Sequence, residues 1–532
     1  MKIGRALLGR FLLVTLLVAV CGAGRVEGRE FSPPLPSSPP DRPEVTLPLS
    51  IEQAMELALR NNLSISIERT SVEISDANLE AAQGEFDPRL FAGPALRRTV
   101  VPVSSALSRV GAGAQQLEID EENLDFNAGV RKRLDLGASV ELEFSANRLE
   151  STQGFQNFRP RYAPSLDLSL TQPLLRNFGR EVTRSRIIVA QTNRVISAEA
   201  FRQRVMEIVA LVRDTYWDVV FARGDLAVRR QSLQLARELV EINRAQVEVG
   251  TMAPIEILQA QTRAAQREEE VIIGEKAVAD AIDRLLRVMN VFGNSLVSNL
   301  LIVPSDEPKF EERSVELEAQ IALALQNQPN LTLRRLDLDN LRLNARVQRN
   351  RLLPALDLQA SVGLNGLAGE TQAGVSPFEG DFGDSLDRLR TGDFYQFSVG
   401  LNFELPLGNR TARGEASRAR LELARAELQI RDLEQEVVRQ VNEAVRRLTT
   451  GSKRIASTRI ARRLAEQQLE AEQKRFNVGL STSFNVLEFQ EDLATSRRNE
   501  LLAIIDYNKA QIALAQITGV ILGQYHVELR TP

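Results

Sequence analysis

Apolar residues recur at every second position in several segments of this 532-residue chain. Phe397, Val399 and Leu401, for example, alternate with the polar or small residues Ser398 and Gly400. Such alternation predicts amphipathic strands with one apolar and one polar face. The longest segments approach the ~9–11 residues that a tilted strand needs to cross a bilayer, although alternation by itself also fits a soluble sheet packed on a helix. The pattern covers residues 124–130, 140–144, 166–170, 356–364 and 397–405.

A second pattern predicts long helices over residues 184–249 and 413–478, neither of which contains proline. Leu423, Ile430 and Val437 recur every seven residues opposite a charged face, as in a coiled-coil seam. At a rise of ~1.5 Å per residue, each stretch would reach on the order of 100 Å. Considered alone, these helices also fit an ordinary coiled-coil dimer.

The first residues have the order of an export signal. Three basic residues precede an apolar run at 11–20, and small residues follow it. This order predicts a secretory signal peptide over residues 1–24. Residues 25–48 carry seven prolines from Pro33 onward and are predicted to form a Pro-rich linker.

Cys21, the only cysteine, lies at the end of the apolar run and has two interpretations. It is removed with the signal peptide, or it is the acylated first residue of a bacterial lipoprotein. A lipoprotein signal normally has a small residue before the cysteine, whereas this chain has Val20, which favours removal. A single cysteine also excludes a disulfide framework and any cysteine-cluster metal site.

No later segment offers the ~20 uninterrupted apolar residues of a membrane-spanning helix. The best candidate, residues 501–522, contains Asp506 and Lys509. If the exported protein spans a membrane, it must therefore do so with strands.

The chain contains an internal repeat, which is the feature to establish before any fold is assigned. Residues 247–250 and 476–479 match at an offset of 229, and residues 172–174 resemble residues 405–407. Each half reads as helix, strand, loop, strand, long helix, glycine turn and returning helix. The predicted organisation is a first repeat over 49–292, a connection over 293–314, a second repeat over 315–520 and a tail over 521–532.

The strand count constrains the assembly. One chain holds about four to six strands, whereas membrane barrels begin at about eight. An open sheet in lipid would leave the backbone groups of its edge strands unpaired. The strands therefore either lie outside a membrane or combine with those of other chains to close one barrel.

The duplicated plan, the Val-Gly turn followed by Val486-Leu487 and Gln490, and the Leu-Pro-Leu strand-to-helix junction together resemble the TolC family of outer-membrane efflux proteins. The resemblance implies an α+β membrane protein in which a homotrimer shares one β-barrel in the lipid of the outer membrane of a Gram-negative-type bacterium. A long α-helical barrel would extend from it into the periplasm. The implied partners are a periplasmic adaptor protein and an inner-membrane transporter, in efflux or type I secretion.

Two departures from that family are visible. The hairpin pattern at residues 124–146 puts the usual twelve-strand count in doubt. Near the second turn, family members commonly carry an aspartate in the ring that narrows the periplasmic entrance, where this chain has Asn485. Glu488 keeps a carboxylate on nearly the same helix face, and Glu256 and Gln259 are the counterparts in the first half. We hypothesise that these residues line the entrance; the alternative is that they are solvated residues on helix ends.

Gly250 and Gly479 stand where a long helix ends and the chain must reverse, a position that suits glycine. The resemblance makes these turns the expected docking surface for an adaptor's helical hairpin. Pro173 and Pro406 are predicted at strand-to-helix junctions, because proline cannot donate to a strand ladder.

Other function classes find little support. No P-loop or G-x-S-x-G string is present, and the single histidine is His526, so neither catalysis nor a cofactor is expected. Near-balanced charge, with 66 Lys+Arg against 70 Asp+Glu, gives no bias toward nucleic acid. The leading hypothesis is a passive outer-membrane exit duct driven by a pump. The alternative is an exported structural coiled-coil protein without a pore.

Overall fold

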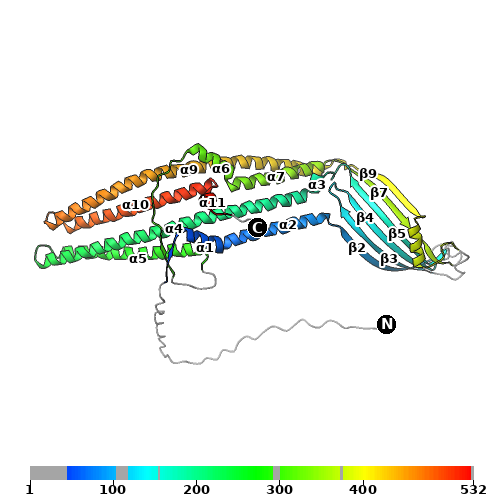
Figure 1. The fold of residues 1–532 in the computed structure, drawn as a ribbon, viewed down its shortest axis with the longest axis horizontal. Coiled ribbons are helices and arrows are strands. Elements are labelled where there is room, and N and C mark those ends of the chain that lie inside the picture. Colours follow the sequence, from blue (N-terminus) through cyan, green and yellow to red (C-terminus); the bar gives the residue numbers. More distant parts are fainter. Residues whose placement is uncertain (1–44, 104–117, 154–155, 292–299, 372–375, 529–532) are drawn as a thin grey trace, which may run out of the picture.

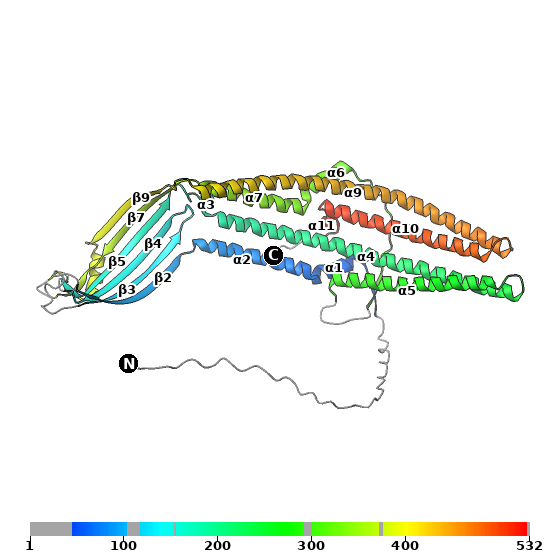
Figure 2. The same cartoon turned by 180° about the vertical axis from the view of Figure 1, so that it is seen from behind.

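The computed structural model describes residues 45–103, 118–153, 156–291, 300–371 and 376–528. Long helices run side by side along most of the molecule, and a twisted sheet continues from one of their ends (Figures 1 and 2). The predicted signal peptide and Cys21 lie outside the described residues, so both interpretations of Cys21 stay predictions. No helix in the described ranges is long and apolar enough to cross a bilayer.

One antiparallel ladder contains six long strands in the order β2-β3-β4-β5-β7-β9, and the short β8 pairs with the outer part of β5. The alternating pattern correctly predicts five of them, including the extra hairpin of β3 and β4. It misses β2, because Gly93, Pro94 and two arginines interrupt its alternation. The strands are β2 (Arg89–Pro102), β3 (Glu118–Arg133), β4 (Ser139–Ser151), β5 (Phe158–Pro173), β7 (Ala355–Asn365), β8 (Ala368–Thr371) and β9 (Tyr395–Glu404).

The two longest helices are α4 and α9. Each packs along shorter helices of its own half, and α7 and α10 also contact α4. α2 and α5 lie along α4, whereas α7 and α10 lie along α9 (Figure 1). The same order of elements occurs in both halves, which confirms the two-repeat plan. The helices are α1 (Ile51–Asn61), α2 (Leu63–Gln83), α3 (Arg180–Thr183), α4 (Ser185–Glu248), α5 (Ile255–Met289), α6 (Leu317–Asn327), α7 (Pro329–Asn350), α8 (Phe382–Thr391), α9 (Arg410–Asn477), α10 (Ser483–Ile517) and α11 (Ile521–Gln524).

The predicted coiled-coil seam of α9 is occupied by helices of the same chain. Val437 and Val441 are fully buried in a cluster with Ala324 of α6 and Leu331 of α7. Leu421 and Leu428, nearer the sheet, remain exposed. The heptad pattern therefore reflects packing within the chain along this part of α9, and it does not require a coiled-coil dimer.

The largest apolar core surrounds the middle of α4, where a small parallel sheet of β1 (Val45–Leu49) and β6 (Leu300–Pro304) packs against it. The Tyr216 hydroxyl oxygen lies 2.8 Å from the Asp306 carboxylate and 3.0 Å from the Leu49 carbonyl, and its single hydrogen is shared between these two acceptors. The predicted Pro-rich linker includes residues 45–48, but the structure corrects this, because they form most of β1. Their backbone groups find partners in β6, about 255 residues away, which no local pattern reveals.

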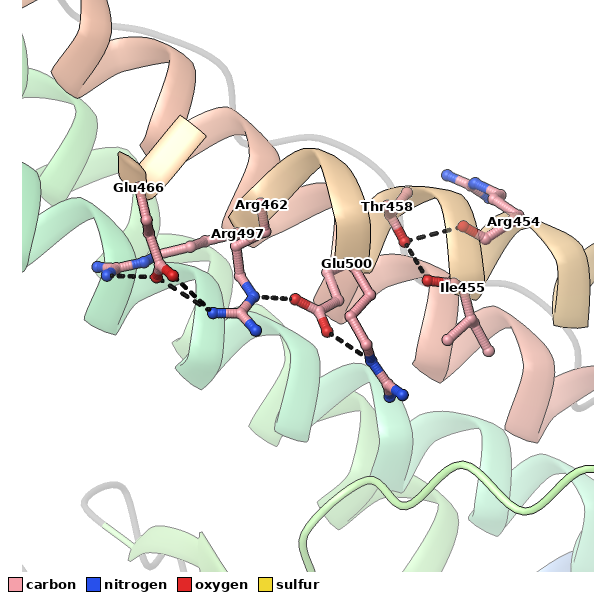
Figure 3. A network of polar contacts seen from close by, with 8 residues as sticks. Arg454, Ile455, Thr458, Arg462, Glu466, Arg497 and Glu500 are labelled. Carbon is pink, nitrogen blue, oxygen red and sulfur yellow. Dashed lines mark hydrogen bonds and ion pairs between the residues drawn. The ribbon is translucent and has the colours of Figure 1, made fainter. Parts of the chain in front are cut away.

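A polar network joins α9 to α10 (Figure 3). The Arg462 guanidinium pairs with Glu500 and also with Glu466 at 3.1 Å. Arg497 donates to Glu466 at 3.0 Å and to Gln231 of α4 at 2.6 Å. These contacts join three neighbouring helices between the apolar cluster around Ile455 and Tyr507 and the one around Leu469 and Leu493.

Candidate functional site

The sheet has one apolar and one polar face. On β9, Phe397, Val399 and Leu401 are 73%, 73% and 65% exposed. In the ladder, Phe397 and Val399 lie beside apolar residues of β7, and Phe126 and Leu142 continue the same face on β3 and β4. We call this exposed face, which extends over β3, β4, β5, β7 and β9, the apolar band. A contiguous apolar surface across several strands marks a region that contacts another apolar phase.

The opposite face carries a continuous set of polar side chains. Ser165 Oγ lies 2.9 Å from Ser145 Oγ and donates to Asp167 Oδ2 at 2.6 Å. Gln396 on β9 donates to Asp167 Oδ1 at 2.8 Å, and Asn147 on β4 donates to Asp125 Oδ1 at 2.7 Å. Apolar on one side and hydrogen-bonded polar on the other is the alternation of strands that separate lipid from a water-filled interior.

The ladder ends in two unpaired edges. Among the described residues, β2 pairs only with β3, and β9 pairs only with β7. Both edge strands are long, with 14 and 10 residues. Unpaired backbone groups beside an apolar face cannot be satisfied by lipid, so these edges need strands from elsewhere.

At the far end of the helices from the sheet, two tight turns connect α4 to α5 and α9 to α10 (Figure 1). Gly250 and Gly479 adopt positive φ angles of 79° and 77°. After each, a backbone N–H closes the helix end: Thr251 N donates to the Gln246 carbonyl at 2.9 Å and Leu480 N to that of Arg475 at 2.8 Å. Left-handed backbone at this position is the reason that both turns use glycine.

Replacing Gly479 with alanine is expected to destabilise the α9–α10 turn by about 1 kcal/mol, because a side chain is unfavourable at positive φ. Gly414→Ala is the matched control, since Gly414 lies inside α9 and no atom outside the adjacent turns of its own helix lies within 4 Å of the position that an alanine methyl group would occupy. There alanine should favour the helix by about 1 kcal/mol. Hydrogen exchange across residues 475–485 should accelerate in the first variant and stay unchanged in the second.

The two tips meet through Glu256. Ser483, fully buried at the start of α10, donates its hydroxyl hydrogen to the Glu256 carboxylate at the start of α5. Arg267 of α5 also pairs with Glu491 of α10 at 3.0 Å. These contacts cross between the two helical hairpins and hold their ends together. Sequence spacing did not reveal them, because the partners are more than 220 residues apart.

The other three predicted entrance residues have separate surroundings. Glu488 is exposed beside Arg263 and Arg267 in a hollow of about 350 Å³ between α5 and α10. Asn485 is half-buried, and its side chain donates to Ser481 Oγ at 3.2 Å. Gln259 is exposed on α5. The structure thus adds two arginines near Glu488 that the sequence analysis did not single out.

The two prolines stand where strands give way to helices. Pro173 is the last residue of β5, and the following Leu174 N–H donates to the Leu356 carbonyl at 2.7 Å. Pro406 follows the end of β9 at Glu404 and precedes α9, which begins at Arg410.

A further ionisable group, the carboxyl of Asp214, lies among the packed helices. Asp214 of α4 is partly buried, and its Oδ1 has no hydrogen-bond partner. Burial raises the pKa of Asp214 to about 6; the nearby Asp218 carboxylate also raises it, whereas Lys509 lowers it. Lys509 itself pairs with Asp218. Among the described residues, no group of three or more His, Cys, Asp or Glu side chains is arranged to hold a metal ion.

Asp214→Asn is expected to stabilise the protein at pH 7 by about 1–3 kcal/mol, at ~1.4 kcal/mol per pKa unit. The folded state binds a proton at Asp214 between pH 3.8 and about 6, where the unfolded chain does not. Through this group, stability therefore rises as pH falls through that window, and the substitution should remove that rise. Thermal unfolding in detergent against pH measures it, with the exposed Asp506→Asn as control; equal pH profiles for all three proteins would contradict the assignment.

A sheet with one lipid-compatible face, attached to long helices, defines a membrane-channel type of fold. Residues 127–291 and 320–520 match the family described as Outer membrane efflux protein. The chain therefore belongs to the outer membrane efflux protein family, and the resemblance to TolC is confirmed. Its location is the outer membrane. No protein with a curated description matches the sequence.

Solved structures share the fold at low sequence identity. The CmeC outer membrane channel of Campylobacter jejuni has 14% identity and a TM-score of 0.64, covering 88% of this chain and 86% of that chain. VceC from Vibrio cholerae has 16% identity and a TM-score of 0.60, covering 88% and 96%. The open state of the MtrE channel of Neisseria gonorrhoeae has 14% identity and a TM-score of 0.59, covering 89% of each chain.

Proposed function

We propose that three copies of this chain form a passive exit duct that crosses the outer membrane. The duct has no chemistry of its own and takes its cargo, small molecules or proteins, from an energised inner-membrane transporter through a periplasmic adaptor protein. The helical part extends into the periplasm, and the sheet contributes to a shared barrel. Membership of the outer membrane efflux family supports this proposal.

The observation that carries the proposal is the pair of free edges on a two-faced sheet. Six strands are too few to close around a lumen, since membrane barrels start at about eight. β9 of one copy pairing with β2 of the next would satisfy both edges and place every apolar face outward. Three copies then give about eighteen strands.

A barrel of about eighteen strands is wider than the twelve-stranded barrel that is usual in the TolC family. With strands ~4.8 Å apart and tilted by ~40°, about eighteen strands enclose a barrel roughly 36 Å across, against roughly 24 Å for twelve. The hairpin of β3 and β4 accounts for the difference, because it adds two strands to each copy. The exit is then wider than in a twelve-stranded barrel.

At the tips, three-fold symmetry would turn each carboxylate into a ring of three. The exposed Glu488 would then attract cations at the entrance, as charged constrictions do in other channels. Glu256, held by Ser483, would keep the two hairpins of each copy together, and Gly250 and Gly479 would present the turns to an adaptor.

Planar-bilayer recording tests this function. The wild-type protein should give discrete conductance steps with cation preference, and Glu488→Ala should reduce the cation-to-anion permeability ratio several-fold. Glu427→Ala, an exposed carboxylate of α9 far from the tips, serves as control and should leave the ratio unchanged. Absence of any conductance from folded protein would favour the coiled-coil alternative, and an unchanged ratio in Glu488→Ala would remove the ring.

A further inference from the structure

The connection between β8 and β9 contains α8, which is held in place by caps at both ends and by hydrogen bonds to neighbouring segments. Asp381 and Asp384 form a capping box at its start, and Gly392 ends it at a φ of 74°. The Arg388 guanidinium donates to four backbone carbonyls of neighbouring segments, including those of Leu367 at 2.8 Å and Pro377 at 3.0 Å. α8 is therefore a fixed part of the sheet's outer end.

α8 lies on the apolar face of the sheet. The Phe382 ring packs edge-on against Tyr162 of β5, with ring centres 6.0 Å apart. The helix backbone also seats on Gly366, where a side chain would come within 2.2 Å of the Ser385 carbonyl oxygen. Tyr162 occupies the same face as Leu166 and Leu168, which belong to the exposed apolar band. α8 thus leaves the polar face uncovered.

Between α8 and the sheet is a cavity of about 440 Å³, open to the apolar band. Its volume is about three times that of the ~150 Å³ apolar cavity that stays dry and holds one benzene. The walls are almost entirely hydrocarbon. The apolar part of the lining consists of Leu124 and Phe126 of β3, Phe144 and Ala146 of β4, and Phe382 and Leu386 of α8, and Asn147, Arg148 and Tyr162 complete it.

Charged residues close the outer end of this cavity. Arg148 stands at its rim and pairs with Glu150 at 2.8 Å and Glu122 at 3.7 Å. On the neighbouring strand pair, Arg98 meets Asp120 at 2.6 Å, at the same end of the band. The change from apolar to charged residues marks the level at which hydrocarbon gives way to lipid headgroups.

We propose that this cavity binds one acyl chain of an outer-leaflet membrane lipid, with the lipid headgroup at the level of Arg148. The proposal rests on the orientation given above, with the helices in the periplasm. The cavity is continuous with the lipid-facing band, so an acyl chain can enter it from the bilayer. A cavity with almost entirely apolar walls is filled more favourably by hydrocarbon than by water.

Lipid retention tests the proposal without any transport assay. Assembled protein is exchanged into detergent, washed, and examined by native mass spectrometry after reconstitution with phosphatidylethanolamine of defined chain length. Wild type should retain one lipid per chain, and Ala146→Phe, which fills the cavity, should lose it. Ala92→Phe adds the same bulk to the apolar face on β2, away from α8, and should behave as wild type. Equal retention in all three, or none in wild type, overturns the proposal.

A second readout guards against misfolding of the cavity variant. Trp217 is the only tryptophan and is buried in the helical core. In a Trp217→Phe background, Leu386→Trp should be quenched by lipids with brominated acyl chains several-fold more than Arg390→Trp, which lies on the exposed side of α8. Equal quenching of the two tryptophans would show that no acyl chain enters the cavity. A neighbouring copy of the protein found to occupy the cavity would show the same. Either result leaves the exit-duct proposal standing, because conductance is measured separately.

Discussion

Introducing two lysines on the apolar face of β9, as Val399→Lys with Leu401→Lys, is expected to abolish assembly in the outer membrane. Both side chains project from the lipid-compatible face and are largely exposed in the single chain. A lysine on the lipid face near the middle of the bilayer costs about 2–4 kcal/mol, so the pair costs about 4–8 kcal/mol per copy. That cost is comparable to the net stability of a typical fold, which is about 5–15 kcal/mol.

The matched control is Ser398→Lys with Asn402→Lys, which adds the same charges to the same strand on the polar face. These lysines would face water in the lumen and should allow assembly. Membrane fractionation and migration of the unheated assembly on gels measure both variants. If the two pairs behaved alike, the assignment of the faces would be wrong.

Removing the hairpin of β3 and β4 is expected to narrow the barrel from roughly 36 Å to roughly 24 Å. Deleting residues 103–157 joins the outer end of β2 to the outer start of β5. β2 and β5 run in opposite directions, so they can pair directly as an antiparallel hairpin. Each copy would then contribute four strands.

The diameter is measured in electron-microscopy images of the particle viewed along its axis. The helical part provides an internal reference, because the deletion touches no helix and its width should stay constant. A barrel of unchanged width would show that β3 and β4 lie outside the wall. Recruitment of additional copies to keep the count would show that strand number, and not the helices, sets the stoichiometry.

Most of the fold follows from short-range patterns. Period-two alternation identifies β3, β4, β5, β7 and β9, because an antiparallel strand with one apolar and one polar face alternates in this way along the sequence. β2 is hidden by Pro94 and Gly93, which weaken the strand signal. The repeat offset of 229 places both glycine turns, since each must reverse a long helix.

What the sequence could not provide are contacts between distant segments. Ser483 meets Glu256 across the two tips, and β1 meets β6 across 255 residues. These pairs depend on how the distant segments pack together, so no spacing in the chain records them. The heptad pattern around Val437 is ambiguous for a different reason. It fits packing against a second chain as well as the packing within one chain that the structure shows.

The predicted entrance residues show what the sequence can and cannot provide. Glu488 was singled out from its distance to the turn, but the arginines beside it come from α5, which folds against α10. Asn485 makes a local hydrogen bond to Ser481 within its own turn. Their effect on ions depends on how three copies meet, which is a property of the assembly and not of one chain.

The most direct measurement is the symmetry and strand number of the detergent-extracted particle, determined by electron microscopy. We predict a three-fold particle in which β9 of each copy pairs with β2 of the next, giving one barrel of about eighteen strands above a helical tube. A monomeric particle, or three separate sheets around a closed axis, would contradict the account.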